Sequence, residues 1–361
     1  MRGDTTRQVM MTTTTPEQLV PLDHPIRKIK PIVERALAEL SPVFEDIYSR
    51  VGRPSIPPEH LLKGQLLMAL FSVPSARRFC DQLQYNMLFK WFLDLNIDDQ
   101  PFHATSFSKN QERLLSQDVA RRFLIQLVEE ARRQDLISSD HFSVDGTLLE
   151  AWASLKSLRP RDGDDEGPPD GGRNPSVDYH GERRKNDTHV SATDAEARLA
   201  RKGDNQAARL CFAGHVLMEH RSGLAVDVEV TQAAGVTEWE AAVEMLERSA
   251  SGGRRKTVAG DRGYDNRAFV RACRQRRITP HVAQFPTTRN RKSAIDGRTT
   301  RHPGYRQSQR WRKRVEEIFG WLKTVGGGRK LRYIGVKRNQ MWAEMAVAAY
   351  NLVRMARLAP A

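Results

Sequence analysis

Cysteine is scarce in this sequence of 361 residues, which has three at widely separated positions: Cys80, Cys211 and Cys273. No CxxC pair occurs, so a disulfide scaffold and a cysteine-based zinc site are both excluded. Long hydrophobic runs are also absent: the longest, around residues 66–73, is far short of the roughly 20 apolar residues that a membrane helix needs. Residues 1–18 contain no apolar signal core. We therefore expect a protein of the reducing cytoplasm that does not enter a membrane.

Acidic residues are few relative to basic ones. The chain has 58 Lys and Arg against 44 Asp and Glu, a formal net charge of +14 and an isoelectric point near 10.0. An excess of this size favours a polyanionic partner, and nucleic acid is the first candidate. The alternative is a basic protein that binds no nucleic acid. Apolar residues make up 39% of the chain, which is enough for a packed core and excludes general disorder.

The pattern of apolar residues divides the chain into parts. Residues 1–24 are polar and rich in Thr, and we expect a disordered N-terminal tail. Residues 25–137 carry apolar residues at helical spacing, with Ser75 as a predicted helix cap, and indicate a helical N-terminal domain. Residues 138–361 alternate between strand and helix patterns, which predicts a mixed α/β domain. Within that domain, residues 159–176 have no apolar residue and many Gly, Pro and Asp, which indicates a flexible insertion.

Two aspartates stand where strands carry or end in polar residues. Asp145 lies on a strand whose residues alternate between apolar and polar, and Asp261 ends a short apolar strand. Sites in open α/β sheets cluster at the carboxyl ends of strands, and Mg²⁺ prefers carboxylate oxygens. An Asp at a strand end is often only a turn former, so each residue alone indicates little.

A predicted helix over residues 310–324 supplies a third candidate acid, Glu316. At about 100° per residue, Arg312, Glu316 and Lys323 fall within roughly 40° of one another and border the buried face of the helix. Glu317 points away from this stripe. An ordinary ion pair between Arg312 and Glu316 on an exposed helix would have the same spacing, so the residues alone leave both interpretations open.

Three segments together resemble the DDE transposases of bacterial insertion sequences, most closely the group named after insertion sequence five. They are SVDGTLLEAWAS around Asp145, AGDRGYDN around Asp261 and RKRVEEIFGWLKT around Glu316. Each segment alone is a modest signal, but the three in this order are specific. The resemblance extends over roughly residues 25–355.

The third segment carries the signature of that family, Tyr-x2-Arg-x3-Glu-x6-Lys. Arg312, Glu316 and Lys323 match it. Gln309 occupies the position of the Tyr, which is a departure, and Tyr305 lies one helical turn earlier.

The resemblance implies a ribonuclease-H-like catalytic domain in which Asp145, Asp261 and Glu316 are catalytic and bind metal. Three neighbouring carboxylates cannot all stay ionised without cations. Two Mg²⁺ ions about 3.5–4 Å apart, or Mn²⁺ in their place, would neutralise them and clamp a scissile phosphate. The implied enzyme is a transposase that cuts DNA at the ends of its element and joins the 3′-hydroxyl ends to target DNA. Two alternatives stay open: a nuclease of the same fold without strand transfer, and a degenerate transposase retained as a DNA-binding protein.

The same resemblance names DNA as the partner, both the terminal inverted repeats of the element and the target, with a homodimer on the DNA at the bacterial nucleoid. DNA phosphates beside the metals are expected to bind Lys and Arg side chains. The stretch 289–314 supplies them, with 10 Lys and Arg against one Asp. The helical domain either reads the repeats through a helix-turn-helix or serves packing and dimerisation. The predicted DNA contacts are Arg312, Lys323, Arg289, Arg291, Lys292, Arg77 and Arg78.

Overall fold

The computed structural model of the chain describes residues 13–48, 55–161, 184–203, 206–235, 237–249, 255–286 and 292–358. The predicted DNA contacts Arg289 and Arg291 lie outside this part of the chain. So does most of the predicted flexible insertion, whose first residues, 159 and 160, belong to a short strand.

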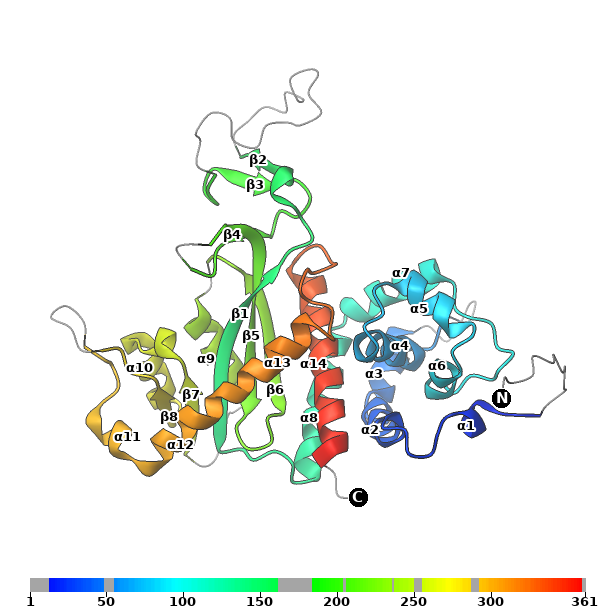
Figure 1. Cartoon of the computed structure of the whole chain (residues 1–361), viewed down its shortest axis with the longest axis horizontal. Helices are drawn as coiled ribbons and strands as arrows, with labels where there is room; N and C mark the ends of the chain where they lie inside the picture. The colour runs from blue at the N-terminus through cyan, green and yellow to red at the C-terminus, as the bar shows by residue number, and fades with distance from the viewer. Residues whose placement is uncertain are drawn as a thin grey trace, which may run out of the picture.

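The described chain before residue 140 is built of helices (Figure 1). Ser75 caps α5 as predicted, because its hydroxyl accepts a hydrogen bond from the backbone N–H of Arg78. Aromatic rings fill the core between the helices, and the ring centroids of Phe79 and Phe107 are 5.2 Å apart. The elements are α1 (Pro16–Leu19), α2 (Ile26–Ala38), α3 (Ser41–Ile47), α4 (Pro58–Leu70), α5 (Ala76–Leu83), α6 (Met87–Phe92), α7 (Ala104–Leu115) and α8 (Val119–Arg133).

Part of the stretch expected to be a disordered tail is ordered. Residues 13–24 include α1, which packs against α6. Glu17 on α1 accepts a hydrogen bond from the indole N–H of Trp91 and pairs with Arg27 at 2.5 Å. These partners are distant in sequence, so local composition gives no sign of them.

A mixed sheet follows the helices. Among the described residues it has six strands: β1 (His141–Glu150), β4 (Arg198–Ala200), β5 (Arg209–Glu219), β6 (Ala225–Gln232), β7 (Lys256–Gly260) and β8 (Ile278–Val282). β5 pairs antiparallel with β1, β6 and β4, whereas β1, β7 and β8 are parallel. The order β6-β5-β1-β7-β8 is that of a ribonuclease-H-like sheet, as the resemblance implies. A separate pair, β2 (Leu158–Pro160) and β3 (His189–Ser191), lies outside this sheet.

Helices cover both sides of the sheet. α9 (Glu238–Ser249) packs on β1, β5 and β6, and α10 (Arg267–Gln275) packs on β8. After α11 (Gly297–Arg301), α12 (Pro303–Trp311) contacts β7 and β8, and α13 (Val315–Lys323) contacts β1. Figure 1 shows α13 crossing in front of the strands.

The last helix, α14 (Val336–Leu358), joins the sheet to the N-terminal helices (Figure 1). It packs against β6 on one side and against α4 and α8 on the other. The buried side chain of Asn351 fixes it to the sheet, because its amide accepts from the backbone N–H of Ala225 at 2.9 Å and donates to the Ala225 carbonyl at 2.7 Å. α8 also contacts β6, so this helix packs with the sheet as well as with the helices before it.

The helix predicted over residues 310–324 is not continuous. α12 ends at Trp311, a 3₁₀ turn covers Arg312–Arg314, and α13 begins at Val315. The 3₁₀ turn changes the rotation per residue, so the predicted angles hold only from Val315 onward.

Candidate active site

Asp145 and Asp261 lie at the same level on neighbouring parallel strands. The register pairs Ser143 of β1 with Ala259 of β7, and each aspartate comes two residues later in its strand direction. A step of two residues keeps a side chain on the same face of a sheet. Asp261 directly follows β7 and accepts a hydrogen bond from the backbone N–H of Gly263 at 2.7 Å, which turns the chain away from the sheet. The fold therefore brings the two predicted aspartates together.

The environment of Asp145 disfavours its ionised form. Burial raises the pKa of this carboxyl to about 6, although a hydrogen bond from the Gly146 backbone N–H opposes the shift. The negative charges of Asp261 and Glu238 raise the pKa further, and the guanidinium of Arg312 lowers it. A third carboxylate, Glu238, is thus part of the same electrostatic cluster, and sequence reasoning did not find it.

Glu238 reaches the cluster from the opposite side of the sheet. It is the first residue of α9, and a Cβ atom at Gly146 would lie 3.1 Å from its Oε1. A Cβ atom at Gly263 would lie 3.8 Å from its Oε2 and 3.0 Å from Oδ1 of Asp261. The two glycines therefore leave the space that this carboxylate enters. Partial burial and the charge of Asp261 raise the pKa of Glu238.

Buried polar groups surround these carboxylates. Tyr264 is fully buried, and its hydroxyl finds no hydrogen-bond partner among the described residues. Burial, and then the charges of Glu238, Asp145 and Asp261, raise the pKa of this hydroxyl well above its usual value. The Tyr264 hydroxyl therefore stays protonated and lies within the field of all three acids.

The α13 side of the site carries the third predicted acid. Lys323 donates a hydrogen bond from its Nζ to Oγ1 of Thr147 at 2.6 Å, and Thr147 shares the sheet face of Asp145. Arg312 acts on Asp145, as described above, and Glu316 lies on α13 between these two cations with its side chain exposed. Glu317 instead pairs with Arg354 of α14, with 3.1 Å between Nη1 and Oε2. The structure thus turns Glu317 toward α14, whereas Glu316 forms no ion pair among the described residues.

The donor chemistry of the site fits a hard divalent cation. Among the described residues no group of three His, Cys, Asp or Glu already converges on one point. Mg²⁺ needs only one or two carboxylates in addition to water and substrate phosphates. Asp145 and Asp261 offer such a pair, and the pKa of Asp145 is raised mainly by burial and further by the neighbouring carboxylates, both of which a bound cation would offset. Burial lowers the pKa of Lys323, whose Nζ donates to Thr147 on the same sheet face.

The remaining predicted DNA contacts lie away from the carboxylates. Arg77 and Arg78 are exposed in the first turn of α5. Lys292 is exposed in the segment before α11. Gln309, at the position of the family's Tyr, donates to the carbonyl of His281, and Tyr305 donates to the carbonyl of Val282 at 2.8 Å. Both side chains therefore fix α12 to the end of β8.

Two transposase family models match parts of this chain. Residues 14–113 match a Transposase domain (DUF772), and residues 183–352 match a Transposase DDE domain. The second range contains Asp261 and Glu316, whereas Asp145 precedes it. A solved piggyBac transposase synaptic complex with hairpin DNA is similar over 92% of this chain and 75% of its own, at 11% identity and a TM-score of 0.40. No curated protein matches. In the described part of the chain, no helix is long and apolar enough to span a membrane.

Proposed function

This chain belongs to the DDE transposases of the insertion-sequence type, and we propose that it cuts DNA at the ends of its element and joins the 3′-hydroxyl ends to target DNA. The supporting observation is the pair of Asp145 and Asp261 at one level of the parallel strands, with the pKa of Asp145 raised to about 6. We propose Asp145, Asp261 and Glu316 as the metal-binding catalytic residues, with Mg²⁺ as the natural cofactor and Mn²⁺ as a substitute. When bound, such ions activate an attacking oxygen and stabilise the leaving oxygen of a phosphodiester.

The side chains around the site have different proposed roles. Asp145 and Asp261 give oxygen ligands from the rigid sheet, so their spacing depends little on loops. Arg312 and Lys323 hold the DNA phosphates beside them, Arg312 through its planar fork and Lys323 as a point charge. Thr147 positions Lys323 through the hydrogen bond to its Nζ. Glu238 and the protonated hydroxyl of Tyr264 complete the wall behind Asp145.

Glu316 is assigned in preference to Glu317 because the two side chains have different contacts. Glu317 is taken up by the ion pair with Arg354. Glu316 is exposed in the first turn of α13 and forms no ion pair among the described residues.

A cleavage and strand-transfer assay on DNA carrying the element ends tests the proposal. Glu316→Gln keeps the shape of the side chain and removes its charge, so we expect a loss of several orders of magnitude in cleavage with DNA binding retained. Glu317→Gln is the matched control, and we expect near-normal cleavage. The proposed assignment is wrong if Glu317→Gln is inactive and Glu316→Gln cuts normally. Cleavage without joined products would favour the nuclease alternative.

The proposed partners are the terminal repeats and the target DNA, bound by a homodimer. The net charge of +14 supports the DNA partner. The exposed Arg77 and Arg78 at the start of α5 support contact by the N-terminal helices. Mixing tagged and untagged chains with end DNA, followed by capture of the tag, tests the dimer.

A further inference from the structure

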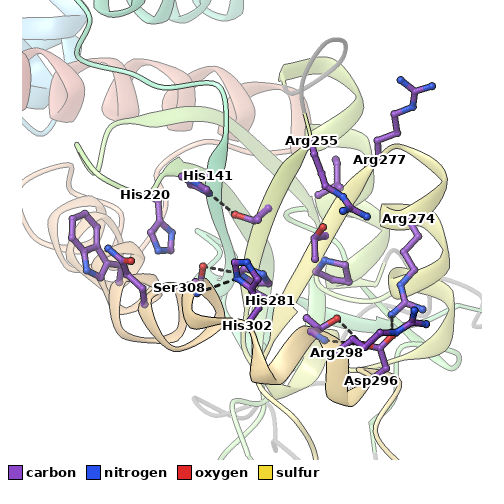
Figure 2. Close-up of a pocket in the computed structure, with 18 of the residues that line it drawn as sticks. His141, His220, Arg255, Arg274, Arg277, His281, Asp296, Arg298, His302 and Ser308 are labelled. Carbon is purple, nitrogen blue, oxygen red and sulfur yellow. Dashed lines mark hydrogen bonds and ion pairs between the residues drawn. The ribbon is translucent and has the colours of Figure 1, made fainter.

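A second basic site lies on the same face of the sheet as Asp145. A pocket of about 1030 Å³ opens at the beginnings of β1, β7 and β8 (Figure 2). His141, Thr257 and Thr279 line it from the three strands, and the register pairs them at one level. His141 precedes Asp145 by four residues on β1, so the pocket floor and the aspartate share a face and are about 13 Å apart along the strand at roughly 3.3 Å per residue.

Arginine dominates the lining of this pocket. Its cationic members are Arg221, Arg255, Arg274, Arg277 and Arg298, against Asp296 as the one acid among the lining residues. Asp296 pairs with Arg274 at 2.9 Å. Within the described chain, no ion pair involves Arg255 or Arg298, although the charge of Arg298 helps to lower the pKa of Asp296. Figure 2 shows the labelled arginines on one side of the pocket and His141 and His220 on the other.

The opposite wall carries the aromatic rings of His220 and Trp311, and the guanidinium of Arg314 lies 4.3 Å from the centroid of the Trp311 ring. The ring of His220 stacks on Trp311, with centroids 5.8 Å apart and planes 2° from parallel. His220 bonds Ser143 through Nδ1, and its buried Nε2 finds no partner among the described residues. Burial lowers the pKa of His220 and of His281 to about 4. The attraction for an anion therefore comes from the arginines, because the Trp311 ring is already contacted by His220 and by the guanidinium of Arg314.

We propose that this pocket binds a DNA strand through its phosphodiester backbone, as a second DNA site beside the catalytic carboxylates. Several arginines that converge on one pocket supply the positive charge that binds the phosphates of a DNA backbone. A volume near 1030 Å³ is far more than one phosphate group fills.

The position of the pocket fits DNA that continues from the active site. A separation of about 13 Å equals roughly four base pairs at 3.4 Å rise. Trp311 lines the pocket, and the next residue, Arg312, acts on Asp145. The junction of α12 and α13 therefore touches both sites. This inference rests on the proposed function in one respect, since it takes the Asp145 face to be the catalytic face.

The test measures binding without catalysis. In a Glu316→Gln background with EDTA, fluorescence anisotropy gives the affinity for duplex end DNA over a range of salt concentrations. For the double variant Arg255→Gln/Arg298→Gln we expect a loss of about tenfold, and a fall of about 2 in the slope of log affinity against log salt. Arg267→Gln/Arg271→Gln removes the same charge from exposed positions of α10 outside the pocket, and we expect its slope to match the parent. Failure here leaves the cleavage results for Glu316 untouched, so the two proposals fail separately.

Two other results overturn the inference. An equal loss in both double variants would show that overall charge alone attracts DNA. Loss of inorganic phosphate or nucleoside monophosphate binding in the pocket variant, with DNA affinity intact, would assign the pocket to a small phosphate ligand. Arg298→Gln alone, at an exposed position of α11, keeps the test valid if the double variant does not fold, with an expected fall of about 1 in the slope.

Discussion

Replacing Asp145 by Asn should stabilise the metal-free protein at neutral pH, although it removes a residue proposed for the reaction. The pKa of Asp145 is raised from 3.8 to about 6 in the folded protein, by burial and by the charges of Asp261 and Glu238. A raised pKa means that the folded state holds the proton more tightly than the unfolded state does. Ionisation of Asp145 therefore costs no stability below about pH 3.8. Its cost grows as the pH rises toward 6 and stays constant at higher pH.

The size of the effect follows from the shift. Each pKa unit corresponds to about 1.4 kcal/mol, so the full shift is about 3 kcal/mol. Asp145 remains partly exposed, and we expect the Asn variant to recover about 1.5–3 kcal/mol at pH near 7.5. The Asn amide oxygen can still accept from the Gly146 N–H, so the variant loses no backbone hydrogen bond. The corresponding rise in Tm is about 2–6 °C.

Thermal unfolding of the apo protein in EDTA is the assay, run near pH 7.5 and near pH 4. The difference between Asp145→Asn and the parent should be present at the higher pH and absent at the lower one. Mn²⁺ should then raise the Tm of the parent more than that of the variant, because tighter binding to the folded state adds more stability. Asp46→Asn, at an exposed position of α3, is the control and should change stability by less than about 0.5 kcal/mol. A variant less stable than the parent in EDTA near pH 7.5 would refute the reasoning.

Three further predictions concern the site and the DNA. Glu238→Gln should weaken Mn²⁺ binding, measured by calorimetry on the apo protein, because it removes a charge from the cluster around Asp145; unchanged affinity would limit Glu238 to packing. Gly146→Ala should reduce the rate of cleavage while the protein stays folded, because the new Cβ would lie 3.1 Å from both Oε1 of Glu238 and Nδ1 of His215 and would displace the carboxylate. Full cleavage activity would show that the position of Glu238 does not matter for the reaction. DNA affinity should fall steeply between about 50 and 200 mM salt as Lys and Arg release counterions from phosphates, and a flat salt dependence would contradict the proposed backbone contacts.

Local sequence patterns predict part of this site. The alternation around Asp145 and the apolar run before Asp261 both indicate strands, and the parallel register that joins them follows from the alternation of strands and helices. The assignment of Glu316 over Glu317 needs only the helical period, because both residues belong to α13. These features depend on residues close in sequence, and the structure brings Asp145 and Asp261 to one level of the sheet, whereas the role of Glu316 stays a prediction.

Glu238 could not be predicted in the same way. An acid in the first turn of a helix is common, because it interacts favourably with the positive end of the helix dipole. Its relation to Asp145 appears only when α9 packs on β1 and the absent side chain of Gly146 leaves room for the carboxylate. The 3₁₀ turn at Arg312–Arg314 also escaped prediction, since the turn contains no Gly or Pro.

The place of α14 sets an order for synthesis of the protein. α4 and α8 pack against this helix, yet about 200 residues separate the end of α8 from its start. At about 5–20 residues per second on the ribosome, the surfaces of α4 and α8 that pack on α14 stay uncovered for roughly 10–40 s before α14 is synthesised. β6 also lacks its partner during this time, because Asn351 of α14 forms hydrogen bonds with both the backbone N–H and the carbonyl of Ala225. A copy of the gene interrupted before codon 336 would therefore yield a chain with these surfaces uncovered, a substrate for chaperones and proteases and unable to act on DNA.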